Sequence, residues 1–119
     1  MADARVFVER VKQMEGVAGC LLIKDDGVLL GRALDDAETY TSLMLTAAGL
    51  AGNIMDKVGF SYCRYVSFNR TNNQTFYIFP IDQYLLGIVQ KADCSVADML
   101  ERVYQLIGRV STDGRRTVS

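Results

Sequence analysis

The stretch GVAGCLLIKDDGVLLGR, residues 16–32, decides the fold of this chain. Residues 18–23 are almost wholly apolar, as expected of a central strand whose two faces are both covered. Asp26-Gly27 stands between two apolar runs, and an Asp-Gly pair in that position strongly favours a tight β-hairpin. The sequence therefore predicts a strand over 18–23, a turn, and a return strand over 28–33.

Helices are predicted on both sides of this hairpin. Apolar residues recur at helical spacing over 3–14, where Asp3 can act as the N-cap. After the hairpin, Asp35 is expected to cap a long helix that runs to about Val58, where Gly59 stops it.

The C-terminal part of the chain reads as three strands and a last helix. The strands are predicted over 62–68, 75–79 and 84–89, and Pro80 marks the end of the second because proline cannot donate to a ladder. The last helix is predicted from 95 to about 110, capped by its first residue, a serine.

This order of elements predicts an α+β fold in which five strands form one antiparallel sheet with helices on its faces. A chain of 119 residues has little room for a second core, so one domain is expected over 3–110. The polar residues 111–119 are expected to form a flexible tail.

Composition narrows the classes of function. Thirteen basic and fourteen acidic residues leave a net charge of −1, which argues against a nucleic-acid surface. No secretory signal and no apolar stretch long enough to insert into a membrane stand out, so a cytoplasmic protein is expected. Cys20, Cys63 and Cys94 are too widely spaced for a zinc motif and are expected to be buried thiols. An apolar fraction of 50% favours a domain that hides some surface in an oligomer.

The residues that usually carry chemistry are missing from the sequence or explained by structure. The chain has no histidine, the commonest general base, and no glycine-rich nucleotide loop. The adjacent carboxylates at 25–26 and 35–36 fall where a turn and a helix cap account for them. We therefore expect no catalytic residue, no metal and no cofactor.

The long helix carries the clearest functional signal. Its apolar residues form one band with a second stripe beside it, and the resulting arc is wider than contact with one sheet requires. The first band is Leu43, Ala47, Leu50, Ile54 and Val58, and the second stripe is Met44, Ala48, Ala51 and Met55. Gly49 and Gly52 each cost about 1 kcal/mol relative to alanine. A close crossing with a helix of a second chain would explain them, and so would a fit beneath the domain's own strands.

The predicted strand 62–68 supplies a second candidate interface. Tyr62, Arg64, Tyr65 and Phe68 place large amphipathic groups on a segment that could lie at a sheet edge. Tyrosine and arginine are enriched at interface hot spots, and an unprotected edge strand tends to pair with a copy of itself. The alternative is that these aromatic residues cap the domain's own core, which for Phe68 is equally favoured.

The element order, the strand–Asp-Gly–strand signature of 16–32 and the Ala/Gly-rich long helix together resemble the roadblock family. That family includes dynein light chains, late-endosomal scaffold subunits and a bacterial gliding-motility protein that partners a Ras-like GTPase. The resemblance covers about residues 3–110 and implies a profilin-like sheet with the long helix on one face and both terminal helices on the other. Family members dimerise by pairing their third strands and their long helices.

Carried onto this sequence, the resemblance implies a non-catalytic homodimer that regulates or scaffolds a small Ras-like GTPase. The implied dimer interface comprises Met44, Ala48, Ala51, Gly52, Met55, Tyr62, Arg64, Tyr65 and Phe68. The implied partner contacts are Tyr40, Thr46, Asn53 and Asp56. Lys57 is the one basic residue of the long helix, so no arginine finger is expected there. Two alternatives stay open: a small-molecule sensor domain of similar build and a structural light chain of a motor or multi-protein complex.

Overall fold

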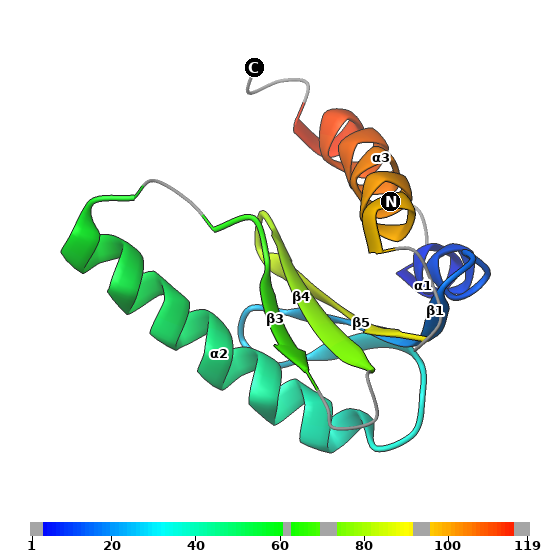
Figure 1. Cartoon of the computed structure of the whole chain (residues 1–119), viewed down its shortest axis with the longest axis horizontal. Coiled ribbons are helices and arrows are strands. Elements are labelled where there is room, and N and C mark those ends of the chain that lie inside the picture. The colour runs from blue at the N-terminus through cyan, green and yellow to red at the C-terminus, as the bar shows by residue number, and fades with distance from the viewer. Residues whose placement is uncertain (1–3, 61–62, 70–73, 92–95, 116–119) are drawn as a thin grey trace.

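The computed structural model describes residues 4–60, 63–69, 74–91 and 96–115. Three helices and five strands follow one another in the predicted order (Figure 1). They are α1 (Ala4–Lys12), β1 (Val17–Lys24), β2 (Leu29–Ala33), α2 (Ala37–Val58), β3 (Val66–Asn69), β4 (Thr75–Ile81), β5 (Tyr84–Gln90) and α3 (Val96–Arg115). The predicted α+β class is confirmed.

The five strands form one sheet in the order β2-β1-β5-β4-β3. Each neighbouring pair is antiparallel, so the predicted five-stranded antiparallel sheet is confirmed. The first and last strands of this order, β2 and β3, form the two edges of the sheet.

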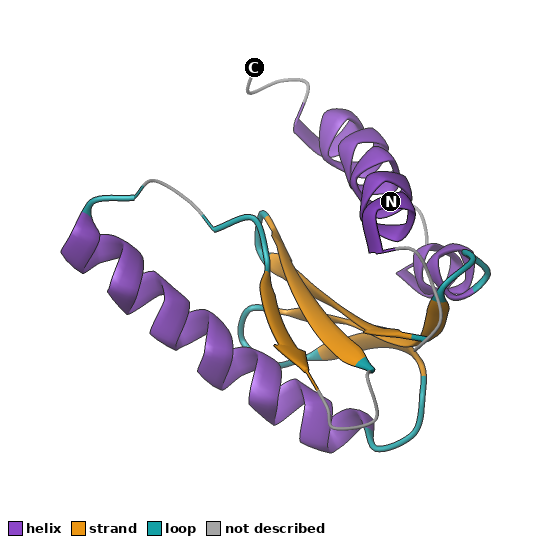
Figure 2. Cartoon of the chain, viewed as in Figure 1, coloured by secondary structure: helices purple, strands orange, loops and turns teal. Residues whose placement is uncertain are grey.

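Helices cover both faces of the sheet, with α1 and α3 on one side and α2 on the other (Figure 2). On the α1/α3 face, Val8 and Met99 pack against Phe79 in one core cluster. On the α2 face, Met44 packs with Leu21 in a second cluster. The implied placement of the long helix opposite the two terminal helices is therefore confirmed.

The Asp-Gly turn forms as predicted. Gly27 has a φ of 97°, a left-handed conformation that glycine adopts without strain. The side chain of Asp26 accepts a hydrogen bond from the Val28 backbone N–H at 3.1 Å, and Lys24 N–H donates to Val28 C=O at 2.9 Å. The return strand begins at Leu29, one residue later than predicted.

The ends of the helices differ in detail from the prediction. Gly59 ends α2 with a φ of 81° and donates its N–H to Met55 C=O at 2.8 Å, as expected of a left-handed glycine cap. At the other end the N-cap is Asp36 rather than Asp35, and its side chain makes no capping hydrogen bond. The first helix ends at Lys12, two residues early, and the proposed Asp3 cap lies outside the described residues.

The last helix is longer than predicted. It continues to Arg115, so residues 111–115 of the expected tail are helical. Its proposed serine cap at position 95 lies outside the described residues, as do residues 116–119.

Two strand boundaries are also corrected. The third strand begins at Val66 rather than at residue 62, and Cys63–Tyr65 form no ladder. The fourth strand does not end before Pro80 but continues through it to Ile81. Strand β3 stops pairing with β4 at Ile78, so, among the described residues, β5 alone pairs with β4 at the proline.

Candidate interaction surface

The side of α2 that faces the sheet is centred on Met44. This side chain is completely buried, and Ala37 and Ala47 are buried beside it. A Cβ added to Gly87 of β5 would lie 2.9 Å from Met44 Sδ and 2.8 Å from Leu21 Cδ2, so the glycine leaves room for both. Met44, predicted at a dimer seam, therefore belongs to the chain's own core and exposes no surface in the single chain.

Apart from Ala47, the first apolar band of α2 is largely open to solvent. Leu50, Ile54 and Val58 are 59%, 61% and 57% exposed, and Leu43 is 38% exposed. The side of α2 that faces the sheet is instead centred on Met44 of the second stripe. Neighbouring stripes lie about 100° apart, and both are apolar here, so periodicity alone could not order them.

The exposed band lies on the flank of α2 that faces β3. Leu45 lies on the opposite flank, because its Cδ1 would be 3.0 Å from a Cβ built on Gly27 in the β1–β2 turn. Leu43 and Leu45 stand about 100° to either side of Met44 on the helix. Leu43, and with it Leu50 in the same band, is therefore turned toward the β3 edge of the sheet.

Strand β3 continues this apolar surface. Val66 and Phe68 pair with Ile78 and Phe76, which belong to the core beneath α2, so both point to the α2 face. Phe68 is 40% exposed there. Among the described residues, β3 pairs with β4 alone, which leaves its outer edge open.

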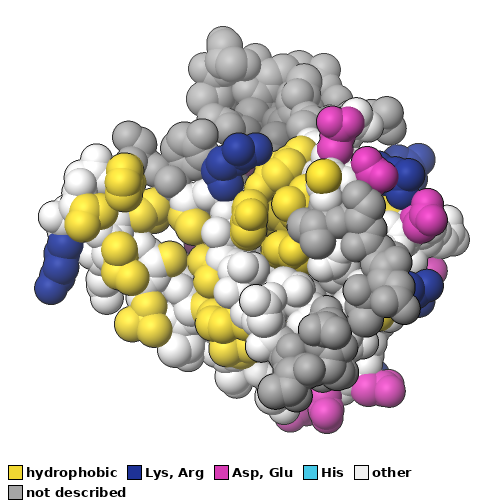
Figure 3. Space-filling view, viewed as in Figure 1, with side chains coloured by type: hydrophobic (Ala, Val, Ile, Leu, Met, Phe, Trp, Pro, Cys, Tyr) yellow, Lys and Arg dark blue, Asp and Glu magenta, His cyan; other side chains and the backbone are white. Residues whose placement is uncertain are grey.

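We call this region the α2–β3 surface. It consists of the open edge of β3 and the exposed apolar side chains of Leu43, Leu50, Ile54, Val58, Phe60 and Phe68. In Figure 3 apolar side chains gather over α2 and continue toward β3. The C-terminal half of α2 runs past β3 at the edge of the sheet (Figure 1), so the chain's own strands do not cover it.

The other predicted seam residues of α2 have different environments. Ala48 is half-buried and packs against the core beneath α2. Ala51, Gly52 and Met55 are half-buried on the C-terminal half of the helix. A Cβ built on Gly49 or Gly52 would meet nothing within 4 Å, so a fit beneath the chain's own strands does not explain either glycine.

The predicted partner contacts divide into two groups. The ring of Tyr40 packs against Phe76, with centroids 4.8 Å apart, and so contributes to the chain's own core. Thr46, Asn53 and Asp56 are exposed on α2, and their contact with a partner stays a prediction.

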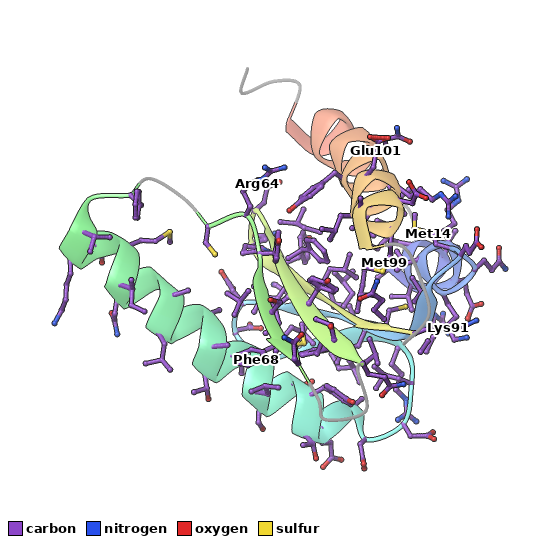
Figure 4. The ribbon with its side chains drawn as sticks, viewed as in Figure 1. Met14, Arg64, Phe68, Lys91, Met99 and Glu101 are labelled. Carbon is purple, nitrogen blue, oxygen red and sulfur yellow. The ribbon has the colours of Figure 1, made fainter. Side chains whose placement is uncertain are left out.

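Segment 63–65, which precedes β3, turns toward the opposite face of the sheet. The ring of Tyr65 lies 5.5 Å from that of Tyr77 and 5.8 Å from that of Phe79. Arg64 points toward α3, and its Cζ lies 4.8 Å from the ring centroid of Tyr104 (Figure 4). Although Tyr65 is 38% exposed, its ring packs on the chain's own core, as the alternative for this strand allowed. Tyr62 lies outside the described residues.

The titratable groups of the core are unreactive. Cys20 is buried and its thiol donates to Val8 C=O at 3.3 Å, and burial raises the pKa of the thiol to about 12. Because the thiolate is the reactive form of cysteine, this side chain is inert at neutral pH. Burial also raises the pKa of Tyr77. Cys63, expected to be buried, is only partly so.

Metal-binding clusters and membrane-spanning helices are absent from the described part of the chain. That part contains no group of three His, Cys, Asp or Glu side chains that could hold a metal ion. In the same residues, no helix combines the length and the apolar character needed to cross a membrane. Two open surface hollows, of about 270 Å³ beside β2 and about 700 Å³ between Arg64 and α3, lie outside the core beneath α2.

Comparison with known proteins identifies the domain type. Residues 4–90 match the family model of the Roadblock/LC7 domain. None of the curated proteins matches in sequence.

Several solved structures share the fold. MglB of Myxococcus xanthus superposes with a TM-score of 0.85 at 12% identity, covering 98% of this chain and 91% of that one. A Roadblock/LC7 domain from Streptomyces avermitilis gives a TM-score of 0.79 at 13% identity, over 92% and 95% of the two chains. Profilin IB of Acanthamoeba castellanii is more distant, with a TM-score of 0.59 at 13% identity over 92% and 98%. At these identities the likeness establishes the fold.

Proposed function

Because the chain belongs to the Roadblock/LC7 domain family, we propose that it is a non-catalytic homodimer that regulates or scaffolds a small Ras-like GTPase. The α2–β3 surface is the observation that supports this proposal most strongly. Leu50, Ile54 and Val58 are each more than half exposed along one helix, and contiguous apolar patches on soluble domains usually mark interaction sites. We place the protein in the cytoplasm, where its cysteines would stay reduced.

A second copy of the chain would cover both the open edge of β3 and the exposed apolar side chains of the α2–β3 surface. If two β3 edges paired antiparallel, the sheet would continue over the C-terminal half of each α2. Ala51 and Met55 would then face the strands of the second copy, and Leu50 and Ile54 would approach its α2. Such an interface is isologous, so each contact occurs twice.

The dimer is tested by analytical ultracentrifugation of Leu50→Glu. We expect a dimer for the unsubstituted chain and a dissociation constant raised at least about 100-fold by the substitution, because a hot-spot residue enters an isologous interface twice. Ser42→Glu is the matched control, since it adds the same charge at an exposed position in the N-terminal half of α2, about 80° around the helix from Leu50. A chain that stays monomeric at high micromolar concentration contradicts the proposal.

The GTPase half of the proposal is supported by the resemblance to the gliding-motility members of the family. The two α2 helices of a dimer would present Thr46, Asn53 and Asp56 as an exposed polar platform. Lys57 is the one basic residue of α2, so the domain would act by favouring one conformation of the GTPase switch loops rather than by donating an arginine.

The test is calorimetric titration with a purified small Ras-like GTPase from the same organism, loaded with GDP or with a GTP analogue. We expect the two nucleotide states to bind with different affinities, and Asp56→Lys to weaken binding about 10-fold, a typical loss for an interface residue. Glu9→Lys, an exposed charge reversal on α1, should leave binding unchanged. A dimer without measurable binding, and without effect on hydrolysis or exchange, would favour a structural light chain instead.

The packing beneath α2 disfavours the small-molecule sensor. Such a domain needs a pocket between sheet and helix. Here Met44, Leu21 and Ile78 are completely buried in that position, and the Sδ of Met44 fills the space left by Gly87.

A further inference from the structure

One aromatic cluster joins the start of β3 to α3. The ring of Tyr65 packs on Phe79, and Phe79 in turn meets Tyr104 of α3 edge-on, with centroids 5.6 Å apart and planes at 90°. The guanidinium of Arg64 lies over the ring of Tyr104. Arg64 therefore contacts Tyr104 of α3 directly, and Tyr65 contacts it through the ring of Phe79. Both residues precede the open edge strand.

Few described side chains hold α3 to the sheet. Met99, Val103 and Leu106 are buried in the core on that face. Toward α1, Arg102 Nη1 lies 3.4 Å from Glu15 Oε1, and both side chains are substantially exposed. Toward the start of β3, Tyr104 contacts Arg64. Helix α3 continues beyond the sheet toward the C-terminus (Figure 1).

The guanidinium suits this contact because it is flat and weakly hydrated. Arginine stacks on an aromatic face in a way that the compact ammonium of lysine does not. The contact therefore fixes the direction of the Arg64 side chain as well as placing a charge near the ring. Since Arg64 lies outside the β3–β4 ladder, the position of segment 63–65 depends on this contact and on the packing of Tyr65.

We propose that the Arg64–Tyr104 contact couples the pairing of β3 with a second copy to the docking of α3 on the sheet. A strand added to the open edge of β3 orders segment 63–65, which leads directly into the paired residues. The ordered segment holds Arg64 and Tyr65 against the ring cluster and so stabilises α3. Arg64 acts as a positioning residue in this scheme, which rests on the proposed homodimer.

The coupling is reciprocal. If pairing of β3 stabilises the docking of α3, then loosening α3 must weaken pairing by the same factor. Loss of an exposed cation–π contact should raise the dimer dissociation constant about two- to fivefold, which corresponds to the energy of such a contact. Arg64→Ala and Tyr104→Leu should both produce this change, whereas Tyr104→Phe keeps the ring and should retain the coupling.

Hydrogen exchange of the α3 backbone amides tests the inference, since protection reports local opening. The full chain is measured below and above its dimer dissociation constant. We expect amides of residues 99–106 to exchange about two- to fivefold more slowly in the dimer. Arg64→Ala should remove this difference while a dimer still forms, and Arg32→Ala, an exposed arginine on the other edge strand, should preserve it.

Two results overturn the inference alone: a dimer whose α3 exchanges as fast as in the monomer, or an Arg64→Ala dimer with the protection difference intact. A chain that is monomeric at every concentration overturns the proposed homodimer as well. Arg64→Lys provides a second variant, because it keeps the charge and should lose most of the protection difference.

Discussion

Both halves of α2 are rich in apolar residues, but they differ in what they contact. In the N-terminal half Met44 and Ala47 are buried against the chain's own sheet. In the C-terminal half Leu50, Ile54 and Val58 are more than half exposed. The first half therefore stabilises the fold of the single chain, and the second half leaves an apolar surface exposed.

Replacing one residue of each half of α2 by alanine should give the largest difference in the free energy of unfolding. Met44→Ala should lower the free energy of unfolding by about 2–5 kcal/mol, because it leaves a cavity beneath α2 next to Gly87. Leu50→Ala, the matched exposed substitution, should change it by less than about 0.5 kcal/mol. Urea denaturation followed by circular dichroism, at a concentration where the chain is monomeric, measures both. Equal losses for the two variants would show that the two halves of α2 do not divide in this way.

Cys20 is buried on the face of the sheet opposite α2, so its titration reports on core packing independently of the α2–β3 surface. The pKa of Cys20 is raised from 9.0 to about 12 by burial, so the folded chain keeps a proton that the unfolded chain releases above pH 9. The stabilisation is therefore complete below pH 9 and is lost as the pH rises from 9 to 12. By pH 10 the loss should reach about 1.4 kcal/mol, one unit of pH above the unfolded pKa.

Cys20→Ala removes this titration, so its free energy of unfolding should fall less steeply over the same range. The comparison uses slopes, which the small packing loss of the substitution does not affect. Parallel slopes for the two proteins would contradict the assignment to Cys20. Leu50→Glu should keep the slope of the unsubstituted chain, because Leu50 is exposed and lies outside the core that contains Cys20.

Local signals predicted the elements of this fold because each is set by nearby residues. Asp26-Gly27 defines a hairpin by turn geometry alone, and Gly59 ends α2 because it tolerates a left-handed backbone. The side of α2 that faces the sheet could not be predicted in this way. It depends on the fit of Met44 beside Gly87 and of Tyr40 on Phe76, contacts between residues far apart in the sequence.

The candidate site was predicted less well than the fold for the same reason. Arg64 and Tyr65 read as strand residues, but contacts with Tyr104 and Phe79 turn them toward α3. Leu50 and Ile54 read as core residues because the sequence does not reveal that α2 extends past the sheet edge. The width of the apolar arc indicated that more of α2 is apolar than the sheet covers, but it did not show that Met44 is buried while Leu50 and Ile54 are exposed.

The smallest expected change in stability comes from Gly49, which is open to solvent, and it contrasts with that from the closely packed Gly87. A Cβ at Gly49 meets nothing within 4 Å, so Gly49→Ala should raise the free energy of unfolding by about 1 kcal/mol through helix propensity. Gly87→Ala is the contrasting variant, because its Cβ would lie within 2.9 Å of the Leu21, Met44 and Phe76 side chains and should destabilise by about 1–3 kcal/mol. Urea denaturation of the monomer measures both.

Gly49→Ala also reports on the extent of the interface. Gly49 lies closer to the Leu45 flank of α2 than to the α2–β3 surface, so the dimer dissociation constant should not change. A dimer weakened by this one methyl group would place the second copy against Gly49. The close helix crossing considered for the two glycines would then be correct, and the interface would extend around α2 beyond the band of Leu50 and Ile54.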